Sequence, residues 1–263
     1  MKLRTFKQGG VHPPENKLSA SLPIQELGLP DQVSIHMAHH LGAPAVPIVK
    51  KGDRVKVGTL IAQKGQAFIS ANIHSSVSGT VFKIDDVPGV TGYKDTAVII
   101  KVEGDEWEES IDGSDELVEE IKLTPGEILK KIEDMGIVGL GGAAFPTHIK
   151  YMVSEERKAD TLVVNGVECE PFLTSDHRLM LERTDEILIG VQVMMKAGKV
   201  NRTLIGIEAN KPDAIELLQT KAQKYPGVEV VPLKVKYPQG AEKQLIKALL
   251  NREIPSGKLP LDV

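Results

Sequence analysis

The spacing of hydrophobic residues changes once along this chain, and the change coincides with a run of acidic residues. Before the run, residues 46–102 hold short segments rich in Val and Ile that are interrupted by turn-forming residues. After it, residues 121–251 alternate amphipathic stretches of helical spacing with short apolar runs. The run itself, residues 103–120, carries ten Asp or Glu and no Lys or Arg. We therefore expect two domains, residues 1–102 and 121–263, joined by an acidic, solvated linker.

The first domain is expected to be an all-β module. Its apolar segments are short and bounded by turn residues, and no helix of ten residues fits across 46–102. The expected strands are Val55–Ala62, Ala67–Ile73, Gly79–Ile84 and Ala97–Val102. Segments of this kind are typical of a small β-barrel or sandwich.

Two runs in this domain resemble a biotinyl/lipoyl-type barrel-sandwich hybrid. They are Lys51–Leu60 and, further along, His74–Val81. Domains of that type carry a modified lysine at a hairpin tip. The corresponding place here falls near Phe68, and the nearest lysine, Lys64, is a few positions away. We therefore interpret the module as structural.

The second domain is expected to alternate helices with strands. The expected helices are Pro125–Met135, Thr147–Val153, Asp176–Leu181, Thr184–Ala197, Pro212–Tyr225 and Gly240–Asn251. The expected strands are Thr161–Asn165, Thr203–Glu208 and Val228–Leu233. This alternation predicts an α/β fold with a mostly parallel sheet, which binds ligands at the carboxyl ends of its strands.

A glycine-rich run precedes the first of these strands. Gly139, Gly141 and Gly142 fall within four positions, so their backbone N–H groups can approach a phosphate closely. The helix expected after the run adds a favourable dipole. Taken by itself, the run is equally compatible with a plain turn. It is not an ordinary dinucleotide fingerprint, because Asn165 stands where the next strand usually ends in an acid.

Polar side chains gather just after the first expected strand of the second domain. Asn165 is followed by Glu168 and Glu170. An Asn amide can both donate to and accept from the edge of a flavin ring. Carboxylates can accept hydrogen bonds from ribose hydroxyls or from a carboxamide. A surface Asx-type turn is the alternative interpretation of this segment.

These two segments together resemble the flavin- and NADH-binding subunit of respiratory complex I. That family has a G-x-G-G-x-G-F-P-T loop, a following lysine, and N-x-x-E-x-E-P after a strand. Tyr237–Ile246 is similar to its Y-x-x-G-E-E element. The closer resemblance is to the C subunit of Rnf-type electron-transport complexes, and it includes Gly9–Lys17 and the barrel-sandwich module. It implies a barrel-sandwich hybrid followed by an α/β, Rossmann-like FMN/NADH-binding domain.

The resemblance implies FMN as the cofactor and NADH as the substrate. It implies that FMN is bound by Gly139, Gly141, Gly142, Lys150, Asn165, Glu168, Tyr237, Gly240 and Glu242. Phe145 would stack on NADH, and Glu170 would hold its carboxamide. Ala144, Val167 and Ala241 depart from the complex I pattern, where a glycine and two acids stand.

The chain has a single cysteine, Cys169, so it cannot hold a four-thiolate iron–sulfur cluster by itself. In the Rnf family, two cysteine-rich cluster motifs lie towards the C-terminus of this subunit. We therefore interpret the chain as truncated, with [4Fe-4S] clusters expected only in the missing region. Cys169 is not expected to act as a nucleophile, because hydride transfer needs none.

The histidines allow a metal site or a structural role. His36, His39 and His40 lie within five positions, but no cysteine is near them in sequence. We expect a structural role and no metal. His148 and His177 are expected to form local hydrogen bonds.

Composition limits the location and partners of the chain. There is no apolar stretch of the ~18 residues that span a membrane, and no signal-peptide core near the N-terminus. There is no basic stripe, and aromatic residues make up 4%, so nucleic acid is not an expected partner. The resemblance implies a peripheral protein on the cytoplasmic side of the cell membrane, with the other members of the complex as partners.

The resemblance implies an NADH-oxidising, FMN-binding subunit of an ion-translocating Rnf-type membrane complex. Electrons would pass through FMN to iron–sulfur clusters that this chain lacks. Two alternatives stay open at this point. One is a flavin-dependent corrinoid reductase subunit, and the other is a docking scaffold that keeps the fold and binds no cofactor.

Overall fold

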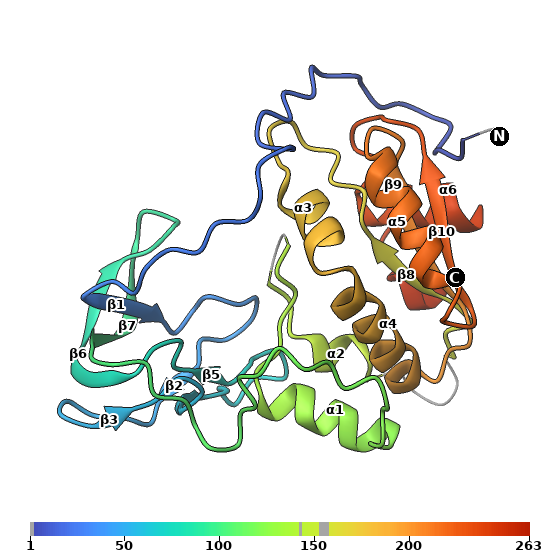
Figure 1. Ribbon diagram of the computed structural model, residues 1–263. Coiled ribbons are helices and arrows are strands. Elements are labelled where there is room, and N and C mark those ends of the chain that lie inside the picture. The colour runs from blue at the N-terminus through green and yellow to red at the C-terminus, as the bar shows by residue number, and fades with distance from the viewer. Residues whose placement is uncertain (1–2, 142–143, 153–157) are drawn as a thin grey trace. The chain divides into compact units, whose positions relative to one another are not determined.

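The computed structural model describes residues 3–141, 144–152 and 158–263, and it contains two compact units (Figure 1). The α/β unit comprises Met1–Glu26, Glu119–Pro125 and Val153–Val263. The β unit comprises Leu27–Val118 and Gly126–Met152. The units are thus discontinuous in sequence, whereas the sequence predicted two continuous domains. The N-terminal residues belong with the α/β unit because their backbone pairs there, with bridges from Arg4 to Leu233 and from Val11 to Tyr237.

The α/β unit is built on a parallel three-stranded sheet in the order β10-β9-β8. Its strands are β8 (Leu162–Asn165), β9 (Thr203–Glu208) and β10 (Val228–Leu233). Its helices are α3 (Ser175–Glu182), α4 (Thr184–Gly198), α5 (Pro212–Ala222), α6 (Glu242–Leu250) and the 3-10 turn η1 (Pro260–Asp262). The predicted alternation of helices and strands is confirmed, and β9 and β10 have the predicted bounds.

Both faces of this sheet are covered by helices (Figure 1). On one face, Ile205 of β9 packs in a cluster with Leu188 of α4 and Leu218 of α5. On the other face, Leu204 packs in a cluster with Leu245 of α6. Successive β9 side chains point to opposite faces, so a strand covered on both faces is apolar throughout. Every residue of β9 is buried, including the polar Thr203 and Glu208 at its two ends.

Two antiparallel sheets form the β unit. The four-stranded sheet has the order β1-β7-β6-β3, with β1 (Gln32–His36), β7 (Lys94–Val102), β6 (Gly79–Pro88) and β3 (Arg54–Val55). The three-stranded sheet has the order β2-β4-β5, with β2 (Val46–Pro47), β4 (Leu60–Gln63) and β5 (Ile73–His74). Val81 and Ile100 of the first sheet share one buried cluster with Ile61 and Ile73 of the second. The two sheets therefore enclose a single core.

Two of the predicted strands are wrong in detail. Val55–Ala62 is divided by a turn, in which the Thr59 N–H donates to the Lys56 carbonyl at 3.0 Å. Ala67–Ile73 is mostly a loop, because the Ser70 hydroxyl donates to the Ala43 carbonyl at 2.9 Å and so offers an alternative to strand pairing. The sequence pattern also did not predict β1 or the outer half of the β6–β7 hairpin.

The segment that carries the glycine-rich run packs with the β unit. Helix α1 (Pro125–Asp134) confirms the predicted helix, and the Asn72 amide donates to the Asp134 carbonyl at 3.1 Å. Gly136 ends α1 at φ 64°, and a Cβ there would lie 2.1 Å from the Asn72 carbonyl oxygen. Helix α2 (Thr147–Lys150) is shorter than predicted, and the predicted end at Val153 lies outside the described residues.

The acidic run is not a free linker along its whole length. The Val57 N–H donates to the Glu106 carbonyl at 2.9 Å, and the Glu108 N–H donates to the Val57 carbonyl at 3.0 Å. Its first part therefore belongs to the β unit. In the described part of the chain, no helix is both long enough and apolar enough to cross a membrane.

Candidate functional site

Polar residues lie at or just beyond the carboxyl ends of the three parallel strands, at one edge of the sheet. Asn165 is the last residue of β8, and Glu208 is the last residue of β9. Beyond β10, Lys236 and Tyr237 follow, and the Lys236 N–H donates to the Glu208 carboxylate at 2.9 Å. Because parallel strands end at the same edge, this edge is where an α/β sheet binds ligands.

The loop after β8 and the turn before α6 are joined at this edge. Asn165 Nδ2 donates to the Gly240 carbonyl oxygen at 2.8 Å, and Asn165 Oδ1 accepts from the Val167 N–H at 3.3 Å. The Gly240 N–H points to Cys169 Sγ at 3.3 Å. A Cβ on Gly240 would lie 3.3 Å from Val167 and 3.4 Å from Cys169 Sγ, so a larger residue would be tightly packed there.

The side chains expected to contact FMN here differ in exposure. Asn165 and Glu242, the first residue of α6, are exposed, and Tyr237 is 36% exposed. Glu170, expected to contact NADH, is also exposed. These four side chains are open to a ligand, and they all belong to the α/β unit.

Glu168 differs from these residues, because its side chain is only 2% exposed. Its Oε1 accepts from the Asp176 N–H at 2.7 Å in the first turn of α3. Its Oε2 lies 3.8 Å from Lys17 Nζ and 4.0 Å from Lys211 Nζ, without a hydrogen-bond partner among the described residues. The structure thus gives Glu168 a structural role that was not anticipated from the sequence. Its expected contact with the cofactor stays a prediction.

Burial changes the proton affinity of several groups at this edge. Desolvation lowers the pKa of the Lys211 ammonium and raises the pKa of the Glu208 carboxyl. Desolvation also raises the pKa of the Cys169 thiol, so Cys169 is less readily ionised than a free thiol. A raised thiol pKa agrees with the expectation that Cys169 is not a nucleophile.

A polar pocket of about 170 Å³ opens at the same edge. It is lined by residues from the N-terminal segment and from the ends of the strands, among them Lys17, Cys169, Glu208, Asn210, Lys236 and Tyr237. Positive and negative side chains share its wall, as in a site for a polar, hydrogen-bonding group.

The glycine-rich loop is held in the β unit. It is closed by a bridge between Val138 and Pro146, and the Gly139 N–H donates to the Phe145 carbonyl at 3.0 Å. A Cβ on Gly141 would meet nothing within 4 Å, so its backbone is open to a ligand. Gly142 lies outside the described residues.

The positively charged side chain of Lys150 lies beside this loop. Lys150 Nζ lies 3.5 Å from the position of a Cβ on Gly139 and 6.0 Å from the centre of the Phe145 ring. Bare backbone next to an ammonium group suits an anion such as a phosphate. The predicted site residues therefore form two sets. Gly139, Gly141, Phe145 and Lys150 lie in the β unit. Asn165, Glu168, Glu170, Tyr237, Gly240 and Glu242 lie in the α/β unit.

Comparison with protein families agrees with both units. Residues 132–263 match the model of the Nuo51 FMN-binding domain. The chain belongs to this family. Residues 5–105 match the RnfC barrel sandwich hybrid domain. The two matches confirm the resemblance to the C subunit of Rnf-type complexes and the predicted barrel-sandwich hybrid.

The Nuo51-family chain is similar to the C subunits of ion-translocating oxidoreductase complexes from several bacteria. It is 48% identical to that of the proton-translocating ferredoxin:NAD(+) oxidoreductase complex of Clostridium ljungdahlii, over 99% of this chain and 56% of the relative. It is 43% identical to that of the Na(+)-translocating ferredoxin:NAD(+) oxidoreductase complex of Acetobacterium woodii, over 100% of this chain and 58% of the relative. It is 36% identical to the C subunit of the ion-translocating oxidoreductase complex of Rhodobacter capsulatus, over 99% of this chain and 50% of the relative. The chain spans about half the length of these relatives.

Four residues that shape the site of this Nuo51-family chain were not predicted from the sequence. They are Glu15, Lys17, Glu208 and Lys211. Lys211 is 2% exposed, and its Nζ donates to the Val167 carbonyl at 2.8 Å. A lysine three positions after the end of a strand was the available signal for Lys211. For Lys17, the signal was its place at the end of the Gly9–Lys17 run.

Two of the histidines have hydrogen-bond partners, and the third expected one lacks a partner at one ring nitrogen within the described part of the chain. His177 Nε2 lies 2.8 Å from Asp213 Oδ1, which confirms the expected hydrogen bond. His40 Nε2 accepts from the Ala71 N–H at 2.9 Å. His148 is buried, but its Nδ1 has no partner among the described residues. Over residues 3–141, 144–152 and 158–263, no group of three His, Cys, Asp or Glu side chains is arranged to hold a metal ion.

Proposed function

We propose that this chain binds FMN and oxidises NADH within an ion-translocating Rnf-type membrane electron-transport complex. The observation that carries the proposal is the match of residues 132–263 to the Nuo51 FMN-binding domain. The names of the relatives, which include ferredoxin:NAD(+) oxidoreductase complexes, support NADH as the substrate. The strand order β10-β9-β8 supports a Rossmann-like fold for the α/β unit, because it is the order of one Rossmann half.

In the β unit, we propose that the glycine-rich loop contacts the phosphate of FMN. The open backbone at Gly141 lets N–H groups approach an anion, and Lys150 adds a positive charge beside Gly139. Gly142 takes the same role in the proposal. A larger side chain at these positions would occupy the path of the phosphate.

In the α/β unit, we propose that residues at the edge of the sheet contact the flavin ring. Asn165 has two amide hydrogens and an oxygen with two lone pairs, and its two bonds to Gly240 and Val167 use one of each. One donor and one acceptor stay free for the edge of a flavin ring. Tyr237 and Glu242 flank Gly240 in sequence and present exposed side chains for the same purpose.

We propose that Phe145 and Glu170 contact NADH. When bound, FMN supplies the acceptor for the hydride of NADH. The Phe145 ring offers a stacking face for the nucleotide, and the exposed Glu170 carboxylate can accept hydrogen bonds from a carboxamide. Both residues orient the substrate and exchange no electrons themselves. Their contribution to the rate is therefore one of orientation.

In this proposal, the electrons taken from NADH pass from FMN to iron–sulfur clusters that lie outside this chain. The chain has one cysteine, so [4Fe-4S] clusters must be supplied from outside its 263 residues. The other members of the complex are the expected partners, with the chain peripheral on the cytoplasmic side of the membrane. By itself, the chain is proposed to act as an NADH-dependent flavin oxidoreductase.

Equilibrium binding of FMN tests the proposal most simply. The purified chain is mixed with FMN and separated by ultrafiltration, and the flavin spectrum of the retained fraction is measured. Retention of one FMN per chain is expected. A chain that keeps its folded circular-dichroism spectrum but retains no FMN would instead be the docking scaffold.

A further inference from the structure

The N-terminal arm, defined as residues 3–20, is tied to the loop between β8 and α3, residues 166–174. Lys17 Nζ donates to three carbonyl oxygens of this loop, those of Glu168 at 2.9 Å, Glu170 at 2.9 Å and Leu173 at 2.6 Å. An ammonium group has three donors and no acceptor. All three donors of Lys17 are thus used on the loop, and the ammonium is not free to bind a ligand.

This loop has a backbone conformation that needs external support. Glu168 has φ 50° and Phe172 has φ 68°, both in the left-handed region that is unfavourable for residues other than glycine. Such residues persist where surrounding bonds hold them. Lys17 holds the carbonyl of Glu168, and the Glu15 carbonyl accepts from the Phe172 N–H at 3.0 Å. The arm therefore holds both strained positions, which enclose Glu170.

Charge adds a second tie between the arm and the loop. The Glu168 carboxylate is 2% exposed and lies between the ammonium groups of Lys17 at 3.8 Å and Lys211 at 4.0 Å. A buried carboxylate is costly without opposite charge beside it. Lys17 thus supports the loop through its carbonyl oxygens and through this carboxylate.

We infer that Lys17 is a positioning residue for nicotinamide recognition, because it sets the backbone from which Glu170 reaches NADH. The inference rests on the proposed function, since it assigns the consequence of the geometry to NADH binding. The Glu170 side chain is exposed while its carbonyl is bound to Lys17, so the lysine fixes the base of a side chain whose end stays free. Removing Lys17 should therefore impair NADH binding.

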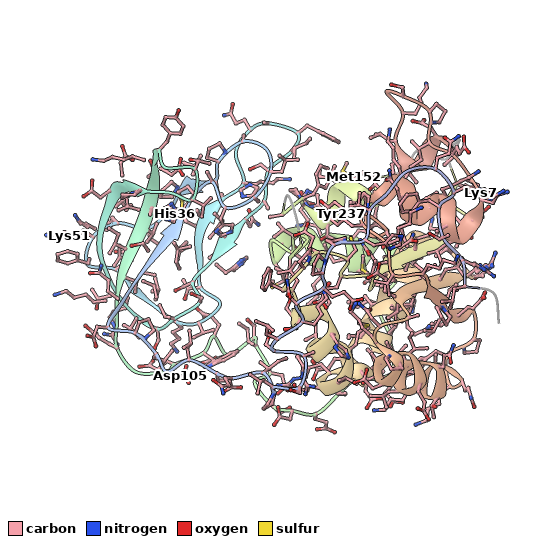
Figure 2. The ribbon with its side chains drawn as sticks, turned by 90° about the horizontal axis from the view of Figure 1, so that it is seen from above. Lys7, His36, Lys51, Asp105, Met152 and Tyr237 are labelled. Carbon is pink, nitrogen blue, oxygen red and sulfur yellow. The ribbon has the colours of Figure 1, made fainter. Side chains whose placement is uncertain are left out.

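The first test uses the chain without FMN and measures amide hydrogen exchange. Lys17→Met removes all three donors, and Lys7→Met, at an exposed lysine of the same arm, is the matched control (Figure 2). Peptides across residues 166–174 should exchange about tenfold faster in Lys17→Met, while peptides from β10 keep the wild-type rate. An unchanged rate across 166–174 would overturn the inference.

A second variant is needed in case Lys17→Met destabilises the whole α/β unit. If Lys17→Met speeds exchange throughout the α/β unit, Lys17→Arg is measured instead. It keeps the positive charge beside Glu168, but a planar guanidinium cannot serve three carbonyl groups in the ammonium geometry. Faster exchange confined to 166–174 is again expected, and the wild-type pattern in Lys17→Arg would contradict the inference.

The second test uses the chain loaded with FMN. In Lys17→Met, the KM for NADH should rise about tenfold, while kcat stays within about twofold. Combined with Glu170→Gln, the two losses should not add, because Lys17 acts through the loop that carries Glu170. Additive losses would mean that Lys17 only stabilises the fold. If the wild-type chain retains no FMN, the proposed function fails, and the exchange experiment alone decides the role of Lys17.

Discussion

Asn165 Nδ2 donates to the carbonyl oxygen of Gly240 over 2.8 Å, across 75 positions of sequence. The bond joins the end of β8 to the turn that precedes α6. Gly240 is close enough to Val167 that a Cβ would meet it at 3.3 Å. The two segments expected at the flavin ring are therefore one packed surface and not two independent loops.

Replacing Asn165 with alanine should loosen this surface. The variant loses the bonds to Gly240 and Val167, and the free energy of unfolding should fall by about 0.5–1.5 kcal/mol. FMN affinity should fall about tenfold, because the free amide donor and acceptor are lost as well. Urea unfolding and FMN titration measure the two effects. Wild-type FMN affinity in Asn165→Ala would remove this residue from the proposed site.

Gly141→Val should prevent FMN binding without unfolding the chain. A Cβ on Gly141 meets nothing within 4 Å, so the fold tolerates a side chain there, but the side chain fills the proposed phosphate path. Gly113→Val is the matched control, since Gly113 also has nothing within 4 Å and lies in the acidic run. A loss of affinity of at least about a hundredfold is expected for Gly141→Val only. Equal affinities in the two variants would place the phosphate elsewhere.

Glu170→Gln should weaken the binding of NADH without weakening the binding of FMN. The amide cannot provide the charge-assisted hydrogen bond of a carboxylate, and its loss should cost roughly 1.5–3 kcal/mol, or about ten- to a hundredfold in NADH affinity. FMN affinity should stay at the wild-type value. Anaerobic reduction of bound FMN at graded NADH concentrations measures the effect. If this variant loses FMN instead, Glu170 belongs to the flavin contacts.

Acid should destabilise the β unit through its histidines. Desolvation lowers the pKa of His39, His40 and His74 below their ordinary value, and of the three His40 is the buried one. As the pH falls below about 6.5, the unfolded chain therefore binds more protons than the folded chain, and stability is lost. His40→Gln removes one titrating group, and its amide oxygen can still accept from the Ala71 N–H.

The measurement is urea unfolding of both proteins between about pH 7.5 and pH 5.5. The wild type should lose more stability than His40→Gln over this interval, so the difference between them shrinks as the pH falls. A constant difference would show that His40 is not among the groups responsible.

Local signals were sufficient for much of the α/β unit. The runs Thr203–Glu208 and Val228–Leu233 are mostly apolar, and both strands have the predicted bounds. Ala67–Ile73 has similar composition, but Ser70 bonds to the Ala43 carbonyl and the segment forms a loop. That bond depends on a residue 27 positions away and leaves no local pattern.

The site shows the same division between local and distant signals. Asn165 and Glu170 were predicted because they lie at and just beyond the end of a strand, in a segment that resembles the N-x-x-E-x-E-P element. Lys17 reaches Glu168 across 151 positions, and no helix or strand period connects them. The burial of Glu168 could not be predicted either, because it depends on the two lysines that neutralise it.

Anaerobic titration of the FMN-loaded chain with NADH tests the central claim most directly. The visible absorbance of bound FMN should bleach with one equivalent of NADH per flavin, and Gly141→Val, which carries no FMN, should show no change. The chain needs no iron–sulfur cluster for this step, because hydride transfer from NADH ends on the flavin. An FMN-loaded wild-type chain whose absorbance stays constant under excess NADH would contradict the account.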